Sequence, residues 1–226
     1  LKKYNETNED EYYNNINKNK EKYDSHLEEC DLVVKELLDS LKELKLDKKT
    51  ILIFTSDHGT SCGEKIGEKF YGVFTYDYTI NVFCMVKIPN QSSKIINQQC
   101  MTIDIFPTIA ELSNTTLQND SFPIQGRSLL SFVNNSENID RDIFVETGGL
   151  YGPWPSPEKH NVFCIRSKEK KLIYNDTPQT WEFYDLKNDP NEINNIYDEN
   201  LEEICVFKEK LIIHLQENNI KTYLTF

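Results

Sequence analysis

The residues of this sequence best suited to chemistry are Asp57 and His58, which are followed at once by Gly59. The pair ends an apolar run at residues 50–55, whose pattern predicts a β-strand buried on both faces, as in a parallel sheet. Loops at the carboxyl ends of such strands carry the functional sites of open α/β sheets. A carboxylate beside an imidazole suits a divalent cation. The alternative is a solvated Asp-His turn, which is the commoner meaning of so short a motif.

Several separated segments follow the strand and its Asp-His pair. They are Gly63-Glu64-Lys65 with Lys69, and residues 76–79 (Tyr-Asp-Tyr-Thr), 103–109 (Ile-Asp-Ile-Phe-Pro-Thr-Ile), 125–130 (Gln-Gly-Arg-Ser-Leu-Leu) and 183–192 (Phe-Tyr-Asp-Leu-Lys-Asn-Asp-Pro-Asn-Glu). In order and spacing they resemble the second half of the catalytic chain in the sulfatase branch of the alkaline phosphatase superfamily. The resemblance implies an α/β fold, part of an alkaline phosphatase-like sheet flanked by helices, in an enzyme that hydrolyses sulfate esters.

The resemblance also implies roles for individual residues. Asp57 and His58 would bind the metal, although many sulfatases have asparagine in place of this histidine and some have histidine. Lys69 matches the lysine that contacts the substrate sulfate, and Lys65 replaces a histidine common in the family. His58 and Lys69 are therefore the catalytic candidates, and Lys65 and Lys69 the substrate-binding candidates. Either lysine could instead be a solvated loop residue.

One divalent cation is expected at the Asp-His pair. Asp57 is a hard oxygen ligand, which favours Ca²⁺ with Mg²⁺ as an alternative. His58 keeps Mn²⁺ open, because imidazole is an ordinary ligand of Mn²⁺ or Zn²⁺ and a less natural one of Ca²⁺.

The sequence has no counterpart of the family's nucleophile. Sulfatases use a Cys/Ser-x-Pro-x-Arg motif whose Cys or Ser becomes formylglycine, and none of the six cysteines has proline two positions on. Ser121 precedes Phe122-Pro123, but Gln125 stands where the arginine would be. The chain also begins at Leu1. We therefore expect a carboxyl-terminal portion of a larger enzyme, inactive alone, with the formylglycine and the first acidic ligands outside it.

Two other functions stay open at this point. The same superfamily includes phosphonate, phosphate monoester and phosphodiester hydrolases, and His58 is compatible with that chemistry. The chain could also be a truncated product that catalyses nothing. A Cys-x-Pro-x-Arg or Ser-x-Pro-x-Arg motif upstream would favour sulfate chemistry, whereas a bare threonine or serine nucleophile would favour phosphorus chemistry.

Composition limits the partners. A chain of 226 residues with 38% hydrophobic content can bury a core, and a formal net charge of −12 argues against nucleic acid or an anionic membrane as partner. No apolar run approaches the roughly 18 residues of a membrane-spanning helix. A small-molecule or glycan sulfate ester is the expected partner. The six cysteines, which lack C-x-x-C spacing, are expected to be buried thiols.

The apolar pattern predicts a series of elements and two domains. The elements are a loop or weak helix at 1–22, an amphipathic helix at 23–44 whose apolar stripe faces the sheet, strands at 50–55, 82–88 and 143–147, a helix at 102–112, short antiparallel strands at 162–166, 171–174 and 181–186, and a final helix at 200–216. Residues 1–135 would form the second part of the α/β catalytic domain. Residues 136–226 would form a carboxyl-terminal subdomain.

Some residues near the expected site are assigned supporting roles. The segment at 76–79 would pack the site loop, and Asp104 and Arg127 would be structural. Tyr151, Trp154 and His160 could line the organic part of the substrate, or could equally be surface or core residues.

Overall fold

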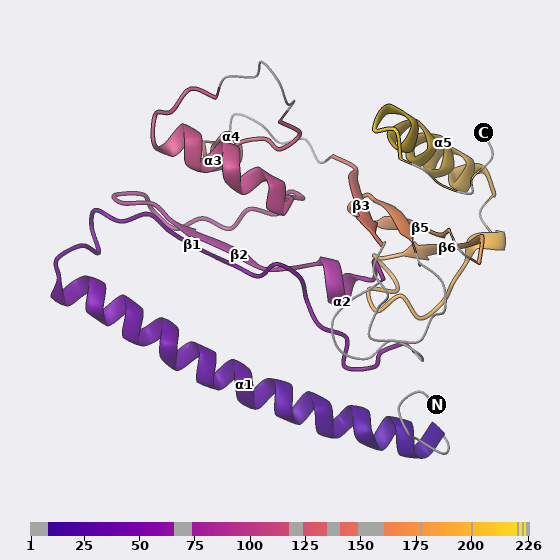
Figure 1. The fold of residues 1–226 in the computed structure, drawn as a ribbon, viewed down its shortest axis with the longest axis horizontal. Helices are drawn as coiled ribbons and strands as arrows, with labels where there is room; N and C mark the ends of the chain where they lie inside the picture. The colour runs from indigo at the N-terminus through magenta and orange to yellow at the C-terminus, as the bar shows by residue number, and fades with distance from the viewer. Residues whose placement is uncertain are drawn as a thin grey trace. The chain divides into compact units, whose positions relative to one another are not determined.

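The computed structural model describes residues 9–65, 74–117, 124–134, 141–148, 161–176, 178–199, 201–220, 222 and 224 (Figure 1). The chain divides into two compact units. The first unit comprises Leu1–Ser92 with Thr147–Val162, and the second comprises Ser93–Glu146 with Phe163–Phe226. The domain boundary expected at residue 135 stays a prediction.

The first unit opens with a 35-residue helix, α1 (Glu9–Glu43). Of the loop or weak helix expected for residues 1–22, the structure has the helix from Glu9 onward. This stretch contains no glycine or proline to interrupt a helix, and Ile16 within it is buried. The helix ends where Lys45 adopts a positive φ of 57° and the Leu46 N–H donates to the Leu41 carbonyl oxygen at 2.8 Å.

The apolar stripe of α1 is not covered by a sheet among the described residues. The side chains of Leu27 and Leu44 are 50% and 67% exposed. The sequence therefore located the stripe correctly, but the expectation of what covers it is wrong for the part of the chain described.

The strand that leads to the Asp-His pair is β1 (Leu52–Thr55), and it pairs with β2 (Cys84–Lys87). The pairing is antiparallel, from Leu52 opposite Lys87 to Thr55 opposite Cys84, and makes a two-stranded sheet. β1 is half-buried and β2 is exposed. The expectation of a parallel strand buried on both faces is thus wrong here, because an apolar run does not reveal the direction or the coverage of its neighbours.

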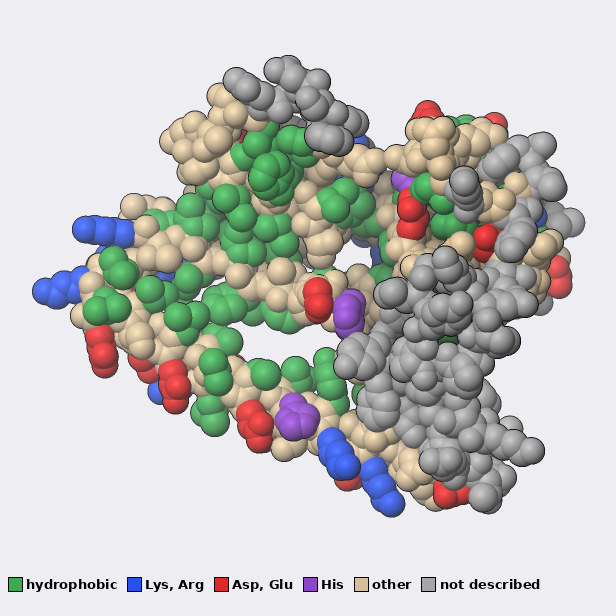
Figure 2. Space-filling view, in the orientation of Figure 1, with side chains coloured by type: hydrophobic (Ala, Val, Ile, Leu, Met, Phe, Trp, Pro, Cys, Tyr) green, Lys and Arg blue, Asp and Glu red, His purple; other side chains and the backbone are tan. Residues whose placement is uncertain are grey.

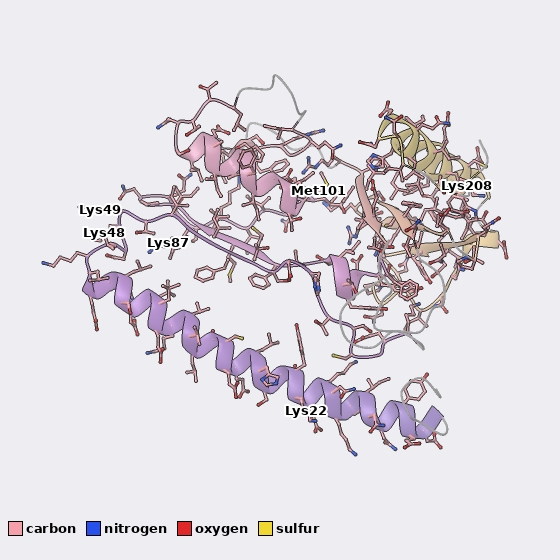
Figure 3. All side chains as sticks on the ribbon, in the orientation of Figure 1. Lys22, Lys48, Lys49, Lys87, Met101 and Lys208 are labelled. Atoms are coloured by element: carbon pink, nitrogen blue, oxygen red, sulfur yellow. The ribbon has the colours of Figure 1, made fainter. Side chains whose placement is uncertain are left out.

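The turn between α1 and β1 carries a group of lysines. Figure 3 shows Lys48 and Lys49 at the end of the unit where Lys87 of β2 also lies. The Lys87 Nζ donates to the Asp47 carbonyl oxygen at 2.9 Å, which ties β2 to this turn.

The second unit begins with short helices held by a buried aspartate. These helices are η2 (Thr102–Asp104), α3 (Ile105–Leu112) and α4 (Leu130–Val133), which confirms the helix expected at 102–112. The Asp104 carboxylate is buried, accepts from the N–H groups of Met101 (2.7 Å) and Arg127 (2.8 Å), and forms an ion pair with Arg141. Asp104 is therefore structural, as expected.

The rest of the second unit contains a β-sheet and a final helix, and the separate subdomain expected for residues 136–226 stays a prediction. A four-stranded sheet runs in the order β3 (Ile143–Thr147), β4 (Val162–Arg166), β5 (Lys170–Asn175) and β6 (Thr180–Asp185), followed by η3 (Tyr197–Glu199) and α5 (Leu201–Glu217). β5 and β6 pair antiparallel from Lys170 opposite Asp185 to Asn175 opposite Thr180.

A hydrophobic core joins this sheet to α5. Its buried members are Phe163, Ile165, Leu172, Tyr174, Phe183, Ile204, Phe207, Leu211 and Leu215. The four from α5 recur at helical spacing, so one face of the helix covers the sheet. Each buried leucine, isoleucine or phenylalanine contributes about 1.5–3 kcal/mol. The second unit thus has a core of its own.

The cysteines are less buried than expected. None of the six is in a disulfide, and only Cys62 and Cys164 are buried. The other four are exposed, namely Cys30, Cys84, Cys100 and Cys205.

Candidate active site

The loop after β1 is tied to the segment around α2 (Asp77–Ile80). The Thr55 hydroxyl donates to the Phe83 carbonyl oxygen at 2.8 Å, and the Gly59 N–H donates to the Thr79 carbonyl oxygen at 2.7 Å. A Cβ on Gly59 would lie 2.1 Å from the Tyr78 carbonyl oxygen, so only glycine allows this approach. The segment at 76–79 therefore packs the site loop, as the sequence predicted.

Asp57 and His58 lie together on this loop. The Asp57 side chain is 87% exposed and the His58 side chain 43% exposed, with His58 Nε2 3.7 Å from Asp57 Oδ2. Asp57 Oδ1 accepts from the His58 N–H at 2.8 Å. The pair thus presents a carboxylate and an imidazole to the same space at the end of the strand.

The ring of His58 is oriented by its own backbone surroundings. Its Nδ1 lies 2.7 Å from the Gly59 carbonyl oxygen, and since a carbonyl only accepts, Nδ1 carries the proton. In the neutral ring the lone pair is then on Nε2, the nitrogen that faces Asp57. The Ser56 hydroxyl donates to the His58 carbonyl oxygen at 2.8 Å and fixes the backbone of the turn. This tautomer suits a metal ligand or a proton acceptor at Nε2.

A cation would need more ligands than this pair. Among the described residues, no group of three or more His, Cys, Asp or Glu side chains could hold a metal ion. Ca²⁺ takes six to eight oxygen ligands and Mg²⁺ an octahedral set. Asp57 and His58 fit a divalent cation by type and by convergence, and a complete site requires further donors.

Glu64 lies close by in sequence but serves the loop itself. Its Oε2 accepts from the Cys62 N–H at 2.8 Å and from the Ser61 hydroxyl at 3.3 Å, and its Oε1 lies 3.5 Å from Lys20 Nζ. Burial raises the pKa of the Cys62 thiol, and the Glu64 charge raises it further, while Lys20 lowers it. A buried thiol of raised pKa is a packing residue rather than a nucleophile, as expected.

Lys65 is held against an aromatic ring. Its Nζ lies 4.8 Å from the centroid of the Tyr76 ring, and Tyr76 is buried with its centroid 5.5 Å from that of Tyr78. Such a cation–π contact fixes the lysine stem at the site loop. The sequence suggested that these tyrosines pack the loop but did not show that they hold Lys65.

The remaining predicted site residues fall outside the described residues. These are Lys69 and the aromatic candidates Tyr151, Trp154 and His160. The structure therefore brings Asp57 and His58 together, places Lys65 on Tyr76, and leaves the sulfate-binding role of Lys69 a prediction.

Comparison with known proteins decides the family. The model described as sulfatase matches residues 2–115, and the model described as N-sulphoglucosamine sulphohydrolase, C-terminal, matches residues 67–219. The chain belongs to the sulfatase family. The resemblance found in the sequence is thereby confirmed, including its placement in the carboxyl-terminal portion.

Two curated relatives of this sulfatase-family chain illustrate the match. The N-acetylglucosamine-6-O-sulfatase of Bacteroides thetaiotaomicron is 29% identical over 194 residues, which cover 83% of the chain and 33% of the relative. Arylsulfatase K of Bos taurus is 28% identical over 177 residues, which cover 74% of the chain and 31% of the relative. The chain thus spans about a third of the length of the curated relatives it matches.

Solved structures agree on the fold. BT4656, solved in complex with its substrate D-glucosamine-2-N,6-O-disulfate, has a TM-score of 0.64 and 26% identity, with 82% of this chain and 37% of that chain covered. BT1596, a 2-O GAG sulfatase, has a TM-score of 0.71 and 18% identity, with 85% and 42% covered. The sulfatase-family chain therefore has the expected α/β architecture, part of an alkaline phosphatase-like fold. No helix in the described ranges has the length and apolarity that crossing a membrane would require.

A phosphonate monoester hydrolase from Silicibacter pomeroyi shares the fold as well. Its TM-score is 0.69 at 18% identity, with 82% of this chain and 38% of that chain covered. At this identity the likeness concerns the fold and not the chemistry.

Proposed function

We propose that this chain forms the metal- and sulfate-binding part of a sulfuric ester hydrolase. The observation that carries the proposal is the exposed pair at the end of β1, in which His58 Nε2 and the Asp57 carboxylate lie 3.7 Å apart on an anchored loop. Membership in the sulfatase family supports the reaction class. The nucleophile, a formylglycine, would lie on polypeptide outside these 226 residues, so the chain alone would be inactive.

The candidate site residues would divide the work of sulfate ester cleavage. A divalent cation held by Asp57, His58 and outside ligands, with Ca²⁺ preferred over Mg²⁺ or Mn²⁺, would stabilise the nucleophile as an anion. Lys69, with Lys65 as the second candidate, would place positive charge over the non-bridging sulfate oxygens. Because Nε2 of a cation-bound His58 holds no proton, a proton for the leaving oxygen would come from His58 only when it is protonated and off the cation, and otherwise from a residue outside these 226.

For the substrate we propose a sulfated amino sugar, alone or within a glycan. The C-terminal family model is described by N-sulphoglucosamine, a curated relative is an N-acetylglucosamine-6-O-sulfatase, and a similar structure holds a glucosamine disulfate. The curated relative is 29% identical to the chain and the similar structure 26% identical.

A phosphonate or phosphodiester hydrolase is the second candidate. His58 supports it, because imidazole is an ordinary ligand of Mn²⁺ or Zn²⁺ and is compatible with phosphorus chemistry. The same assay that tests sulfate hydrolysis decides between the two when an aryl phosphonate monoester is offered beside an aryl sulfate. A third possibility, a non-catalytic product, predicts turnover of neither.

The test joins the chain to the part of the B. thetaiotaomicron N-acetylglucosamine-6-O-sulfatase that lies upstream of the matched segment, matured to carry formylglycine. We expect this fusion protein to hydrolyse glucosamine 6-sulfate and the chain alone to hydrolyse nothing. Asp57→Asn should lower kcat/KM by more than about 100-fold. Replacing a residue that only hydrogen-bonds a metal ligand already lowers metal affinity or activity about 10- to 100-fold, and Asp57 would be a ligand itself.

The matched control is Asp31→Asn, the same substitution at an exposed position of α1, which should leave kcat/KM unchanged. Turnover by the chain without the upstream part would contradict the placement of the nucleophile. Full activity of Asp57→Asn would contradict the metal role.

A further inference from the structure

Four exposed lysines lie at one end of the first unit. They are Lys45, Lys48 and Lys49 in the turn between α1 and β1, and Lys87 at the end of β2. Figure 3 shows Lys48, Lys49 and Lys87 there, and Figure 2, in the same orientation, shows lysine or arginine side chains projecting from this end. These four residues are called the lysine patch below.

The backbone that carries the patch is fixed by its own hydrogen bonds. The Leu46 and Asp47 N–H groups both donate to the Leu41 carbonyl oxygen, at 2.8 and 3.2 Å, and close the end of α1. The Lys49 N–H donates to the Leu46 carbonyl oxygen at 2.9 Å, and the Lys87 ammonium to that of Asp47 at 2.9 Å. The lysines therefore project from a defined turn, so an anion that binds there need not order the backbone first.

No described carboxylate forms an ion pair with a lysine of the patch. This is unlike other described lysines, which lie 2.5–3.6 Å from a carboxylate oxygen, namely Lys20, Lys35, Lys42, Lys170, Lys171, Lys187 and Lys210. Carboxylates are in excess, with 37 acidic residues to 25 basic ones, and Glu43 and Asp47 lie within the same stretch of sequence. The patch thus gathers positive charge in an acidic chain, where it attracts anions.

We infer that the lysine patch binds the sulfate groups of a glycan chain, away from the Asp57–His58 pair. The inference rests on the proposed function and narrows its substrate to a glycan chain rather than a single sugar. Asp57 follows Lys49 by eight residues, which at about 3.3 Å per residue is roughly 26 Å of extended strand. A single sugar is too small to contact both places, whereas an extended glycan can.

A sulfated glycan suits the patch better than a nucleic acid does. A lysine ammonium is a compact charge on a flexible stem, so it can follow sulfate groups at irregular positions along a chain. A protein that contacts about 6–10 phosphates of a duplex needs more cationic groups than these four. A net charge of −12 also leaves little basic surface around them. A glycan held at the patch and at the cleavage site gains avidity from the second contact.

Heparin, a sulfated amino-sugar glycan, tests the patch by calorimetry on the chain itself. The patch variant, Lys48→Gln with Lys49→Gln, should weaken heparin binding about tenfold. It should also make the slope of log Kd against log salt concentration shallower by about 1–2, because fewer counterions are released. The matched control is Lys18→Gln with Lys22→Gln, which removes the same charge from exposed positions of α1 and should leave both quantities unchanged.

The fusion protein with the B. thetaiotaomicron upstream part shows what the patch does for turnover. With a sulfated glucosamine oligosaccharide, the patch variant should raise KM about tenfold and leave kcat unchanged, because the patch holds substrate and transition state equally. With the monosaccharide glucosamine 6-sulfate, kcat and KM should both stay the same. A fault in the fold or at the cleavage site would affect both substrates alike.

The outcomes separate the possibilities. Equal heparin affinity of the patch variant and the control variant would overturn the inference, as would tighter binding of duplex DNA than of heparin at the same salt concentration. Equal losses of kcat/KM on the oligosaccharide and the monosaccharide would overturn it too. Patch-dependent heparin binding without hydrolysis of any sulfate ester by the fusion protein would uphold the patch and contradict the proposed function alone.

Discussion

Replacing Gly59 with alanine should disable the site loop without removing a polar group. A Cβ at this position would lie 2.1 Å from the Tyr78 carbonyl oxygen. Carbon and oxygen atoms of this kind meet no closer than about 3.3 Å, so the two backbone segments must separate by roughly 1.2 Å. The Gly59 N–H bond to the Thr79 carbonyl oxygen, 2.7 Å long, crosses the same contact and would be broken.

The size of the effect follows from this displacement. Overpacking costs about 1–3 kcal/mol and a lost backbone hydrogen bond about 1 kcal/mol, so the loop should be destabilised by about 2–4 kcal/mol. Asp57 and His58 immediately precede the displaced residue and would move with it. A misplacement of about 1 Å can lower a rate by about 100-fold, which is about 2.7 kcal/mol of transition-state stabilisation.

The assay compares kcat/KM of the fusion protein carrying Gly59→Ala with that carrying Gly126→Ala. Gly126 is a matched control because its Cβ would also lie 2.1 Å from a backbone carbonyl oxygen, that of Ile103, in the second unit. Both variants should lose stability, but only Gly59→Ala should lose about 100-fold in kcat/KM. Hydrogen exchange at the Gly59 amide reports the broken bond. If Gly59→Ala retained activity and slow exchange, the close approach would not be what holds the Asp-His pair.

Other consequences of the structure can be tested on the chain itself. Lys171 Nζ and Glu192 Oε1 form a buried ion pair at 2.6 Å. Glu192→Gln leaves the lysine charge buried and unpaired, so it should lower the free energy of unfolding by about 3–5 kcal/mol in urea denaturation. The double variant Lys171→Met with Glu192→Leu removes both charges and should leave the free energy of unfolding nearly unchanged. If the single and the double variant lost the same free energy of unfolding, burial of the ion pair would be contradicted. The Cys62 pKa is raised first by burial and then by Glu64, so Glu64→Gln should move the midpoint of its pH-dependent alkylation to lower pH; an unmoved midpoint would exclude the Glu64 contribution. The isolated chain should bind Ca²⁺ with a Kd above about 1 mM in calorimetry, because Asp57 and one imidazole are too few ligands for tighter binding.

The elements of the second unit could be predicted closely from the sequence. The strands expected at 143–147 and 162–166 have those limits in the structure, as β3 and β4. Their apolar residues are covered by segments of the same unit, as Phe163 and Ile165 show. Where the covering partner lies within the chain, hydrophobic pattern and burial agree and the prediction succeeds.

The first unit was predicted less well, for a physical reason. The pattern of residues 50–55 identified a strand, yet β1 is antiparallel to β2 and only half-buried. The Asp-His pair was located by its position after that strand, but the tautomer of His58 depends on a contact with the Gly59 carbonyl oxygen. Direction of pairing, extent of coverage and ring orientation are set by spatial neighbours, which a local pattern does not specify.

The distribution of burial within the first unit bears on how a complete site would assemble. Its buried residues include Ser61, Cys62, Tyr76 and Thr79, in and around the site loop, while β2 and most of the apolar stripe of α1 are exposed. The loop is thus organised by contacts within the chain itself, without the upstream part. A partner that brings the nucleophile would meet a preset Asp-His pair, so its binding energy need not be spent on ordering the loop. Loop order should then not depend on the upstream part, so hydrogen exchange at the Gly59 amide should be as slow in the chain alone as in the fusion protein.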